Sequence, residues 1–426
     1  MTRRTLEPLA VPTGPDLARL LPRLSRALAG DGPALLLHPV GHPPEPRFGP
    51  GEPLAPDEDD PHDPTALLVA TSGSSGRPKG TLLPAAALLA SVSAVHDRLG
   101  GPGRWLMALP AQYIAGVQVL VRSLVSRTEP VVLDLTEGFD PAAFAAAAGR
   151  LTGSRRYTAL VPTQVVRLLD AGAEATAALA SFDAVLVGGA GIAAPLRERV
   201  LAAGVRMVGS YGMSETCGGC VYDGIPLDGV QQRLGADHPD LAADSPTRIW
   251  LTGPVLARGY RHDPVATTAA FRTDSGGTRW FGTDDAGRYQ DGRLHLIGRL
   301  DALINTGGLK VDPAAVEAAL LRLPGVAEVT VLGVEDPQWG ERVVAAVVPA
   351  AGAVAPDLAA AQARVATEVA AHAAPRQLLV LAAMPLRGTG KPDRARLAEL
   401  AEQAELAQQA TTGSGSDSRS GSGSGI

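Results

Sequence analysis

The sequence predicts an α/β protein with a large N-terminal α/β domain and a small α+β C-terminal domain. A chain of 426 residues is long for one hydrophobic core, and an apolar content of 45 % allows sizeable cores. Short apolar runs alternate with Ala-rich, helix-like stretches, and this pattern changes after residue 298. We therefore place domains at 1–298 and 299–410, followed by a Gly/Ser-rich tail at 411–426 whose composition predicts disorder.

The N-terminal domain shows the alternation most clearly after a Pro-rich start. Residues 1–65 are expected to be irregular, with an acidic patch at 57–60. Apolar runs predict buried strands at Tyr157–Val161, Ala184–Val187, Val205–Val208 and Arg248–Leu251. Helices are expected at Phe139–Arg150, Thr163–Leu169 and Ala194–Ala203.

Two of these strands are followed by Gly-containing segments, 188–191 and 209–212, that indicate turns. Ligands of open α/β sheets collect at the carboxyl ends of strands. We therefore expect Gly189, Ala190, Gly209 and Ser210 to lie at a binding site.

The C-terminal part reads as a separate α+β unit. Its pattern predicts helices at Pro313–Leu323 and Leu358–His372, the second with Asp357 as its N-cap. Strands are expected at Glu328–Val334, Arg342–Val348 and Gln377–Ala382.

Charge and hydropathy restrict the class of protein. A net charge of −6 without a basic stripe argues against nucleic acid as the main partner. No apolar run approaches the length of a membrane span, and the N-terminus lacks the apolar core of a signal peptide. A cytoplasmic location is the expectation.

Cys217 and Cys220 form a C-x-x-C pair, which is compatible with a redox couple or half of a zinc site. No second pair and no thioredoxin-like context accompany it. We favour the alternative that small residues line a tight turn.

A loop rich in Gly, Ser and Thr follows the apolar run 66–70 and ends at Lys79. Backbone N–H groups of such a loop can wrap phosphate oxygens, with a Lys as point charge, although the spacing is not that of a Walker A loop. A second lysine, Lys391, lies between Gly390 and Pro392 and could close over the same anion. The loop donors are Thr71, Ser72, Gly73, Ser74, Ser75 and Gly76.

These segments and two more, Tyr211-Gly-Met-Ser-Glu215 and Gly298-Arg-Leu-Asp301, occur in the order typical of one superfamily. From Leu67 to Leu397 the chain resembles the adenylate-forming enzymes, which include acyl-CoA synthetases, luciferases and peptide-synthetase adenylation domains. The resemblance implies activation of a carboxylate by ATP and Mg²⁺, with CoA as co-substrate. It also implies that the small C-terminal domain is mobile.

The resemblance assigns roles to individual residues. Tyr211 would stack on adenine within the ATP-binding segment that also contains Gly212 and Met213, Ser214 would meet the α-phosphate, and Glu215 would help to hold Mg²⁺. In Phe281-Gly-Thr-Asp284-Asp285-Ala-Gly287 the ribose-binding residue is Asp285 by its spacing to Gly287, although Asp284 stays an alternative. Arg299 would be a second ribose or phosphate contact, and Lys391 would close on the substrate for adenylation.

The same resemblance places the hinge of the mobile domain at Asp301. After the domain rotates, the segment 306–310 would replace Lys391 at the site. Gly307 and Lys310 belong to this segment, and Gly308 would let the pantetheine arm of CoA pass.

The segments 109–123 and 211–227 resemble those of 2-succinylbenzoate–CoA ligases of menaquinone biosynthesis, in particular the actinobacterial branch. This implies that Tyr113, Gly116, Gly209 and Arg122 contact the acid. Because 2-succinylbenzoate has a second carboxylate that is not activated, its pocket needs a cation, and Arg122 lies in an otherwise apolar run. The alternative is an arginine that extends from a helix face toward solvent.

Three other functions stay open. The acid could be another aryl or a short-chain fatty acid, or the chain could be an adenylation domain that serves a carrier protein. From a different class, it could be a nucleotide-binding or scaffold protein without activity, which the joint presence of the charged motif residues disfavours.

Overall fold

A computed structural model describes residues 3–72, 78–235, 247–300, 303–386 and 392–413. The chain forms two compact units. Unit 1 contains Met1–Thr283 and Gly287–Leu296, and unit 2 contains Asp284–Ala286 and Ile297–Ile426. The predicted site residues Gly73, Ser74, Ser75, Gly76, Asp301 and Lys391 lie outside the described residues.

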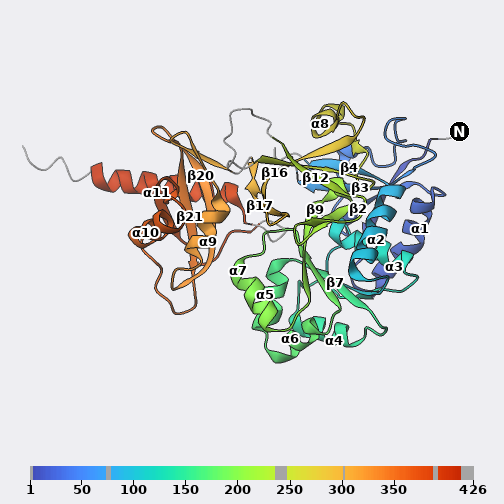
Figure 1. Cartoon of the computed structure of the whole chain (residues 1–426), viewed down its shortest axis with the longest axis horizontal. Coiled ribbons are helices and arrows are strands. Elements are labelled where there is room, and N and C mark those ends of the chain that lie inside the picture. The colour runs from blue at the N-terminus through green and yellow to red at the C-terminus, as the bar shows by residue number, and fades with distance from the viewer. Residues whose placement is uncertain (1–2, 73–77, 236–246, 301–302, 387–391, 414–426) are drawn as a thin grey trace, which may run out of the picture. The chain divides into compact units, whose positions relative to one another are not determined.

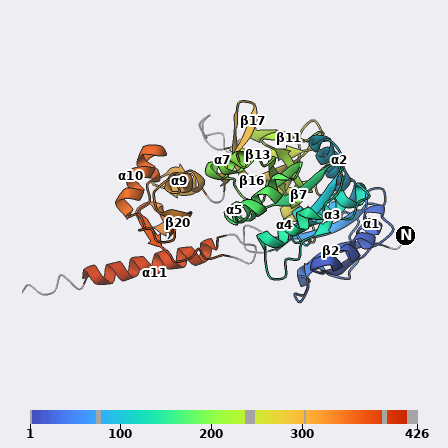
Figure 2. The ribbon, with the colours of Figure 1, turned by 90° about the horizontal axis from the view of Figure 1, so that it is seen from below.

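The largest sheet of unit 1 has seven strands in the order β11-β10-β9-β8-β7-β5-β6, of which β9 to β6 are parallel. Helices α4 to α7 pack on one face through an apolar cluster that includes Phe144, Leu168 and Leu179. Helices α2 and α3 cover the other face (Figures 1 and 2). The strands are β5 (Arg104–Met107), β6 (Val131–Val132), β7 (Arg156–Leu160), β8 (Ala184–Gly188), β9 (Met207–Met213), β10 (Gly218–Tyr222) and β11 (Ile225–Pro226). The helices are α2 (Ala85–Leu99), α3 (Ile114–Val125), α4 (Pro141–Gly149), α5 (Pro162–Asp170), α6 (Ala173–Ala180) and α7 (Ala194–Ala202).

A second sheet of unit 1 has the order β1-β2-β3-β4-β14, and it corrects the expectation that residues 1–65 are irregular. Pro8 is tolerated in β1 because this strand lies at the sheet edge and pairs only with β2. Helix α1 packs its apolar side, Leu24 and Ala27, into the core shared with α2 and α3. The elements are β1 (Leu6–Val11), η1 (Gly14–Leu20), α1 (Leu21–Ala29), β2 (Ala34–Pro39), η2 (Pro46–Phe48), β3 (Thr65–Ser72), β4 (Pro78–Pro84) and β14 (Gly259–Tyr260).

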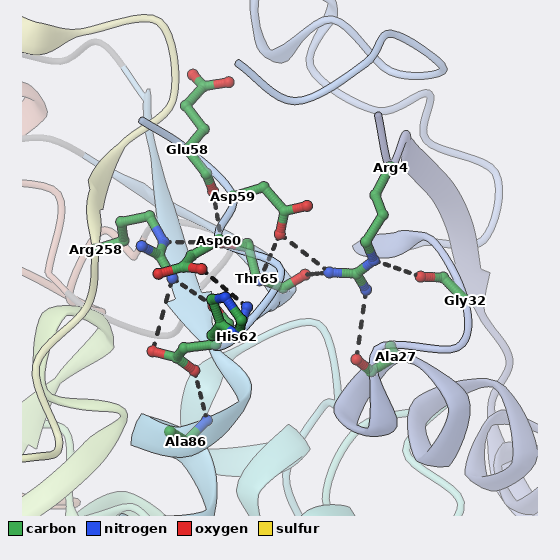
Figure 3. Close-up of polar contacts among 11 residues, drawn as sticks. Arg4, Ala27, Gly32, Glu58, Asp59, Asp60, His62, Thr65, Ala86 and Arg258 are labelled. Atoms are coloured by element: carbon green, nitrogen blue, oxygen red, sulfur yellow. Dashed lines mark hydrogen bonds and ion pairs between the residues drawn. The ribbon is translucent and has the colours of Figure 1, made fainter. Parts of the chain in front are cut away.

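The acidic patch near residue 60 is part of this fold. Asp59 accepts a hydrogen bond from Arg4 Nη1 at 3.1 Å, and Arg258 Nη2 lies 3.6 Å from Asp63 Oδ2. Figure 3 shows both arginines pointing at this segment from different parts of unit 1. The acidic residues therefore connect segments that are distant in sequence.

A third sheet of unit 1 has the order β12-β13-β16-β15. Its β13 confirms the strand predicted at Arg248–Leu251. The elements of this region are β12 (Gln231–Gly235), β13 (Thr247–Thr252), α8 (Pro264–Ala270), β15 (Phe271–Thr273), β16 (Arg279–Gln290) and β17 (Arg293–Arg299).

Unit 2 is built on the sheet β19-β18-β21-β20, with β22 parallel to β21. Alternate residues of β21 face opposite sides: Val343 and Ala345 join the cluster under α9 and α10, whereas Val344 and Ala346 join the cluster under α11. Figure 2 shows α11 on the opposite side of the sheet from α9 and α10. The elements are β18 (Ile304–Thr306), β19 (Leu309–Val311), α9 (Pro313–Leu320), β20 (Val326–Asp336), β21 (Gly340–Pro349), α10 (Leu358–Glu368), η5 (Ala371–Ala373), β22 (Gln377–Val380) and α11 (Arg394–Gly413).

The predicted helices and strands of both units are present, with ends that shift by a few residues, and Asp357 caps α10 by accepting from the Ala360 N–H at 2.7 Å. Besides the expectation for residues 1–65, two further predictions are wrong. The segment 209–212 continues strand β9 and is not a turn, because β8 pairs with β9 on one side and β10 on the other. Helix α11 extends to Gly413, so residues 411–413 are not a disordered tail. Among the described helices, none is both long and apolar enough to cross a membrane.

Candidate functional site

The candidate site is centred on η3 (Ser214–Thr216), directly after β9, which contains Ser210, Tyr211, Gly212 and Met213. Its backbone is held by side chains from two helices. Ser91 of α2 and Gln118 of α3 both donate to the carbonyl of Cys217, at 3.2 and 2.6 Å. Thr216 Oγ1 accepts from the Met213 N–H at 3.0 Å. Ser214 and Glu215 are therefore presented from a rigid turn.

Glu215 is 9 % exposed and interacts with the neighbouring β14. Its Oε1 accepts a hydrogen bond from Tyr260 Oη at 2.8 Å, and its carbonyl accepts from the Ala257 N–H at 2.8 Å. On the other side of the tyrosine, Lys79 Nζ lies 5.0 Å from the centroid of the Tyr260 ring. The structure thus brings together the two charged residues that the motifs predicted, Lys79 and Glu215.

The predicted phosphate loop is the connection of the β3–β4 hairpin. Thr71 pairs with Lys79 and Ser72 with Pro78, so the described ends of the loop are fixed by the ladder. Lys79 is therefore a strand residue, not a loop residue.

The ends of β8 and β9 lie side by side, since Gly188 pairs with Ser210. Gly189 and Ala190 follow β8 and are exposed. Gly212 allows the close approach of β10, because a Cβ at this position would lie 2.1 Å from the Gly218 carbonyl oxygen. Gly212 is needed for this contact between the strands, and a glycine at this position made the sequence resemble that of a turn.

The predicted ribose-binding residues belong to unit 2. Arg299 Nη2 lies 3.3 Å from Asp284 Oδ2, and Asp285 is the next residue of β16. This ion pair involves Asp284, the residue that the sequence analysis ranked second. Which carboxylate binds ribose stays a prediction.

Gly307 and Gly308 form the turn between β18 and β19. Their φ values are +59° and +78°, which a two-residue type I′ hairpin turn requires. Lys310 is exposed on β19. The predicted CoA-side segment is thus a tight hairpin within unit 2.

Arg122, in the last turn of α3, is 3 % exposed. Its Cζ lies 4.9 Å from the ring centroid of Trp105. Among the described residues its guanidinium has no hydrogen-bond or ion-pair partner, and its Nε is fully buried. The side chain does not extend to solvent, which contradicts the alternative of a surface arginine.

Burial lowers the pKa of Arg122, but a guanidinium stays protonated in proteins. The interior of unit 1 therefore holds a cation whose charge no described carboxylate offsets. Other buried polar atoms near it also lack partners among the described residues, including Trp105 Nε1 and, one turn earlier on α3, Gln118 Oε1. Unpartnered buried polar atoms are uncommon in folded proteins, and their grouping indicates a site for a polar ligand.

Of the other predicted acid contacts, Tyr113 is exposed, whereas Gly116 and Gly209 are buried. Tyr113 is the N-cap of α3 and is 41 % exposed, and Gly116 packs against the Pro110 carbonyl. Nine residues are two and a half helical turns, so α3 does not present Tyr113 and Arg122 on one face. Gly209 lies beside Asp223, whose Oδ1 accepts from the Gly209 N–H at 2.9 Å.

The burial of the two cysteines argues against a redox or zinc role. Both thiols are free and fully buried, and burial raises the pKa of Cys220 to about 12 and that of Cys217 further still. Within the described part of the chain, no group of three or more His, Cys, Asp or Glu side chains could hold a metal ion. These findings favour the structural interpretation of the pair.

The sequence analysis missed Tyr260 and Gln118. Tyr260, which follows Leu256-Ala-Arg-Gly, belongs to no motif that it singled out. Gln118 lies within the segment 109–123 but was given no role, and it interrupts the apolar face of α3. A polar residue within an apolar helical run was the available signal for Gln118.

Two family models match the chain: the AMP-binding enzyme at residues 20–261 and the AMP-binding enzyme C-terminal domain at residues 315–391. The chain is 46 % identical to a probable 2-succinylbenzoate–CoA ligase of Mycobacterium tuberculosis, over 91 % of this chain and 97 % of the relative. It is 31 % identical to a feruloyl-CoA synthase of Amycolatopsis sp., over 87 % of this chain and 80 % of the relative.

Among solved structures, O-succinylbenzoate coenzyme A synthetase from Bacillus subtilis, in complex with ATP and magnesium ion, superposes with a TM-score of 0.66. It is 27 % identical, and the match covers 78 % of this chain and 69 % of that one. The sequence matches and the shared fold agree, and the chain belongs to the AMP-binding enzyme family.

Proposed function

We propose that 2-succinylbenzoate is the acid that this AMP-forming acid–CoA ligase activates. The carboxylate of the succinyl arm attacks the α-phosphorus of ATP, which gives the acyl-adenylate and pyrophosphate. The thiolate of CoA then attacks the acyl carbon, which gives 2-succinylbenzoyl-CoA and AMP. The 46 % identical relative from M. tuberculosis, named as a ligase for this acid, supports the proposal.

The observation that carries the choice of acid is the buried charge of Arg122. Removing a guanidinium from water is unfavourable unless an anion accompanies it. In this proposal the anion is the ring carboxylate of the substrate, which is not activated. An acid with one carboxylate has no group left for Arg122 once that carboxylate is at the α-phosphate.

The nucleotide-binding roles follow the motifs. Thr71 and Ser72, with the residues up to Gly76, and Lys79 would hold the phosphates. Gly189, Ala190 and the β9 segment 210–214 would enclose the adenosine, with Tyr211 stacked on the adenine ring. Asp285 and Arg299 would bind ribose, and Lys391 would neutralise charge during adenylation.

Glu215 is the proposed ligand for Mg²⁺. A single buried carboxylate fits this ion, because Mg²⁺ bound to nucleotides takes one or two carboxylates and fills its other positions with phosphate oxygens and water. The absence of a larger cluster of ligating side chains among the described residues agrees with a metal that arrives with ATP. When bound, Mg²⁺ would offset charge on the phosphates.

The direct test supplies the purified protein with ATP, Mg²⁺, CoA and a panel of carboxylic acids. The expected result is AMP, pyrophosphate and an acyl-CoA of the mass of 2-succinylbenzoyl-CoA, with 2-succinylbenzoate preferred over ferulate and short-chain fatty acids. Equal or faster turnover of ferulate would favour the second candidate, an aryl-acid ligase, which the 31 % identity to a feruloyl-CoA synthase supports.

A further inference from the structure

We infer that Tyr260 is a positioning residue. It keeps the side chains of Glu215 and Lys79 in the positions that bind Mg·ATP, without itself touching the nucleotide. The inference rests on the metal and phosphate roles proposed above for Glu215 and Lys79. The inference is supported by the buried side chain of Tyr260, which contacts both Glu215 and Lys79.

The two contacts use different parts of the tyrosine. The hydroxyl donates to Glu215 Oε1 at 2.8 Å, which is a charge-assisted hydrogen bond. The ring lies 5.0 Å from Lys79 Nζ, within the range of a cation–π interaction. Tyr260 is 5 % exposed, so both interactions are shielded from water and correspondingly strong.

Strand pairing explains how the tyrosine reaches both. Tyr260 pairs with Thr81 of β4, and Lys79 lies two residues earlier on the same face, which is the diagonal position that a long side chain reaches. Its ring also packs against Phe271, with centroids 5.9 Å apart. The ring orientation is therefore fixed from more than one side.

The backbone around Tyr260 is anchored by the two arginines that flank it. Arg258 Nε donates to Thr65 Oγ1 at 3.3 Å, and its Nη2 lies 3.6 Å from Asp63 (Figure 3). On the other side, Arg261 pairs with the buried Glu58, which also accepts from the His262 N–H at 3.1 Å. The acidic segment thus fixes both ends of the short β14.

A fixed hydroxyl at Glu215 restricts the rotation of a carboxylate that would otherwise sample several rotamers. It occupies one side of Oε1 and limits the directions from which a metal ion can approach. The cation–π contact keeps the Lys79 ammonium next to the same tyrosine. A mispositioned metal ligand or phosphate contact weakens binding and catalysis even when every group is present.

The test compares Tyr260→Phe with Tyr157→Phe. Both replace a buried tyrosine of unit 1, and the Tyr157 hydroxyl donates to the carbonyls of Leu99 and Gly101 at 2.9 and 3.1 Å. Tyr260→Phe keeps the ring over Lys79 and removes only the donor to Glu215. Binding of ATP is measured by isothermal titration calorimetry over a series of Mg²⁺ concentrations, with no acid present.

We expect the Mg²⁺ concentration for half-maximal ATP affinity to rise about tenfold in Tyr260→Phe and to stay at the wild-type value in Tyr157→Phe. In a Glu215→Ala background, Tyr260→Phe should have no further effect on this value, because the carboxylate that the hydroxyl positions is already absent. Tyr260→Leu, which also removes the ring, should weaken ATP binding at saturating Mg²⁺ as well.

Wild-type Mg²⁺ dependence in Tyr260→Phe, or full additivity with Glu215→Ala, would overturn the positioning role. An equal shift in Tyr157→Phe would mean that loss of any buried hydroxyl disturbs the site, and would overturn it too. Since the titration contains no acid, a wrong choice of acid leaves these results unchanged. Failure of the wild-type protein to bind Mg·ATP at all would instead refute the proposed nucleotide roles.

Discussion

At the scale of single residues, two buried arginines of unit 1 differ in one respect. Arg261 is paired with the buried Glu58, whereas Arg122 has no partner among the described residues. Replacing one member of a buried pair leaves the other charge uncompensated, which costs about 3–5 kcal/mol. Removing an unpaired charge has no such cost.

We therefore expect Arg261→Met to lower the free energy of unfolding of unit 1 by about 3–5 kcal/mol, and Arg122→Met to leave it unchanged or raise it. Denaturant titration monitored by tryptophan fluorescence measures both. Strong destabilisation by Arg122→Met would indicate that this arginine has a structural role.

The cysteines give a prediction with pH. Burial raises the pKa of Cys220 to about 12, so the thiol is protonated at neutral pH and is a poor nucleophile there. Cys217 is shifted in the same direction. Ellman's reagent at pH 8 should modify neither thiol in the native protein and both after denaturation. Rapid native reaction, or retention of zinc, would restore the redox or metal interpretation.

At this scale, the charged residues of the site were predictable from sequence, because each lies in a short motif. Tyr260 was not, since its contacts with Glu215 and Lys79 depend on the pairing of β14 with β4 across more than 170 positions of the chain. The burial of Arg122 could not be predicted from the sequence either, because an arginine in an apolar helix is compatible with both a surface and an interior position.

At the scale of elements, three parallel strands of the large sheet, β7, β8 and β9, were predicted because continuous apolar runs are typical of strands buried on both faces, whereas β5 and β6 were not predicted. The second sheet was missed because prolines interrupt its first strands, and an edge strand tolerates them. The prediction ended strand β9 too early because Gly212 suggested a turn. In the structure, this glycine allows the close approach of β10.

The hairpin at Gly307-Gly308 provides an element-scale prediction. A Cβ at Gly308 would meet no atom within 4 Å, so Gly308→Ala costs only the strain of a positive φ, about 1–2 kcal/mol. If pantetheine passes this turn, the added methyl group should slow thioester formation at least about tenfold and leave pyrophosphate release unchanged.

Gly352→Ala is the matched control, because Gly352 also has positive φ and open space and lies in unit 2. Single-turnover measurements of the two half-reactions separate the effects. Equal behaviour of the two variants would place the path of CoA elsewhere.

At the scale of the whole molecule, the chain consists of two compact units, and movement of the smaller one between half-reactions stays a prediction. Lys391→Ala should reduce adenylate formation by about 10²–10³-fold, because its charge is needed only while charge develops at the α-phosphate. Thioester formation from pre-made acyl-adenylate should be spared. A comparable loss in both half-reactions would argue against a lysine that acts in one of them only.

The most direct measurement of acid recognition combines Arg122 with the ring carboxylate of the substrate. It compares kcat/KM for 2-succinylbenzoate and for 4-oxo-4-phenylbutanoate, which lacks that carboxylate, in the wild-type protein and in Arg122→Met. We predict that the wild-type protein prefers the dicarboxylate by about ten- to a hundredfold, which corresponds to a charge-assisted contact of about 1.5–3 kcal/mol. In Arg122→Met the preference should disappear through an increased KM for 2-succinylbenzoate, with the KM for ATP unchanged. An undiminished preference in Arg122→Met, or none in the wild-type protein, would contradict 2-succinylbenzoate recognition by Arg122.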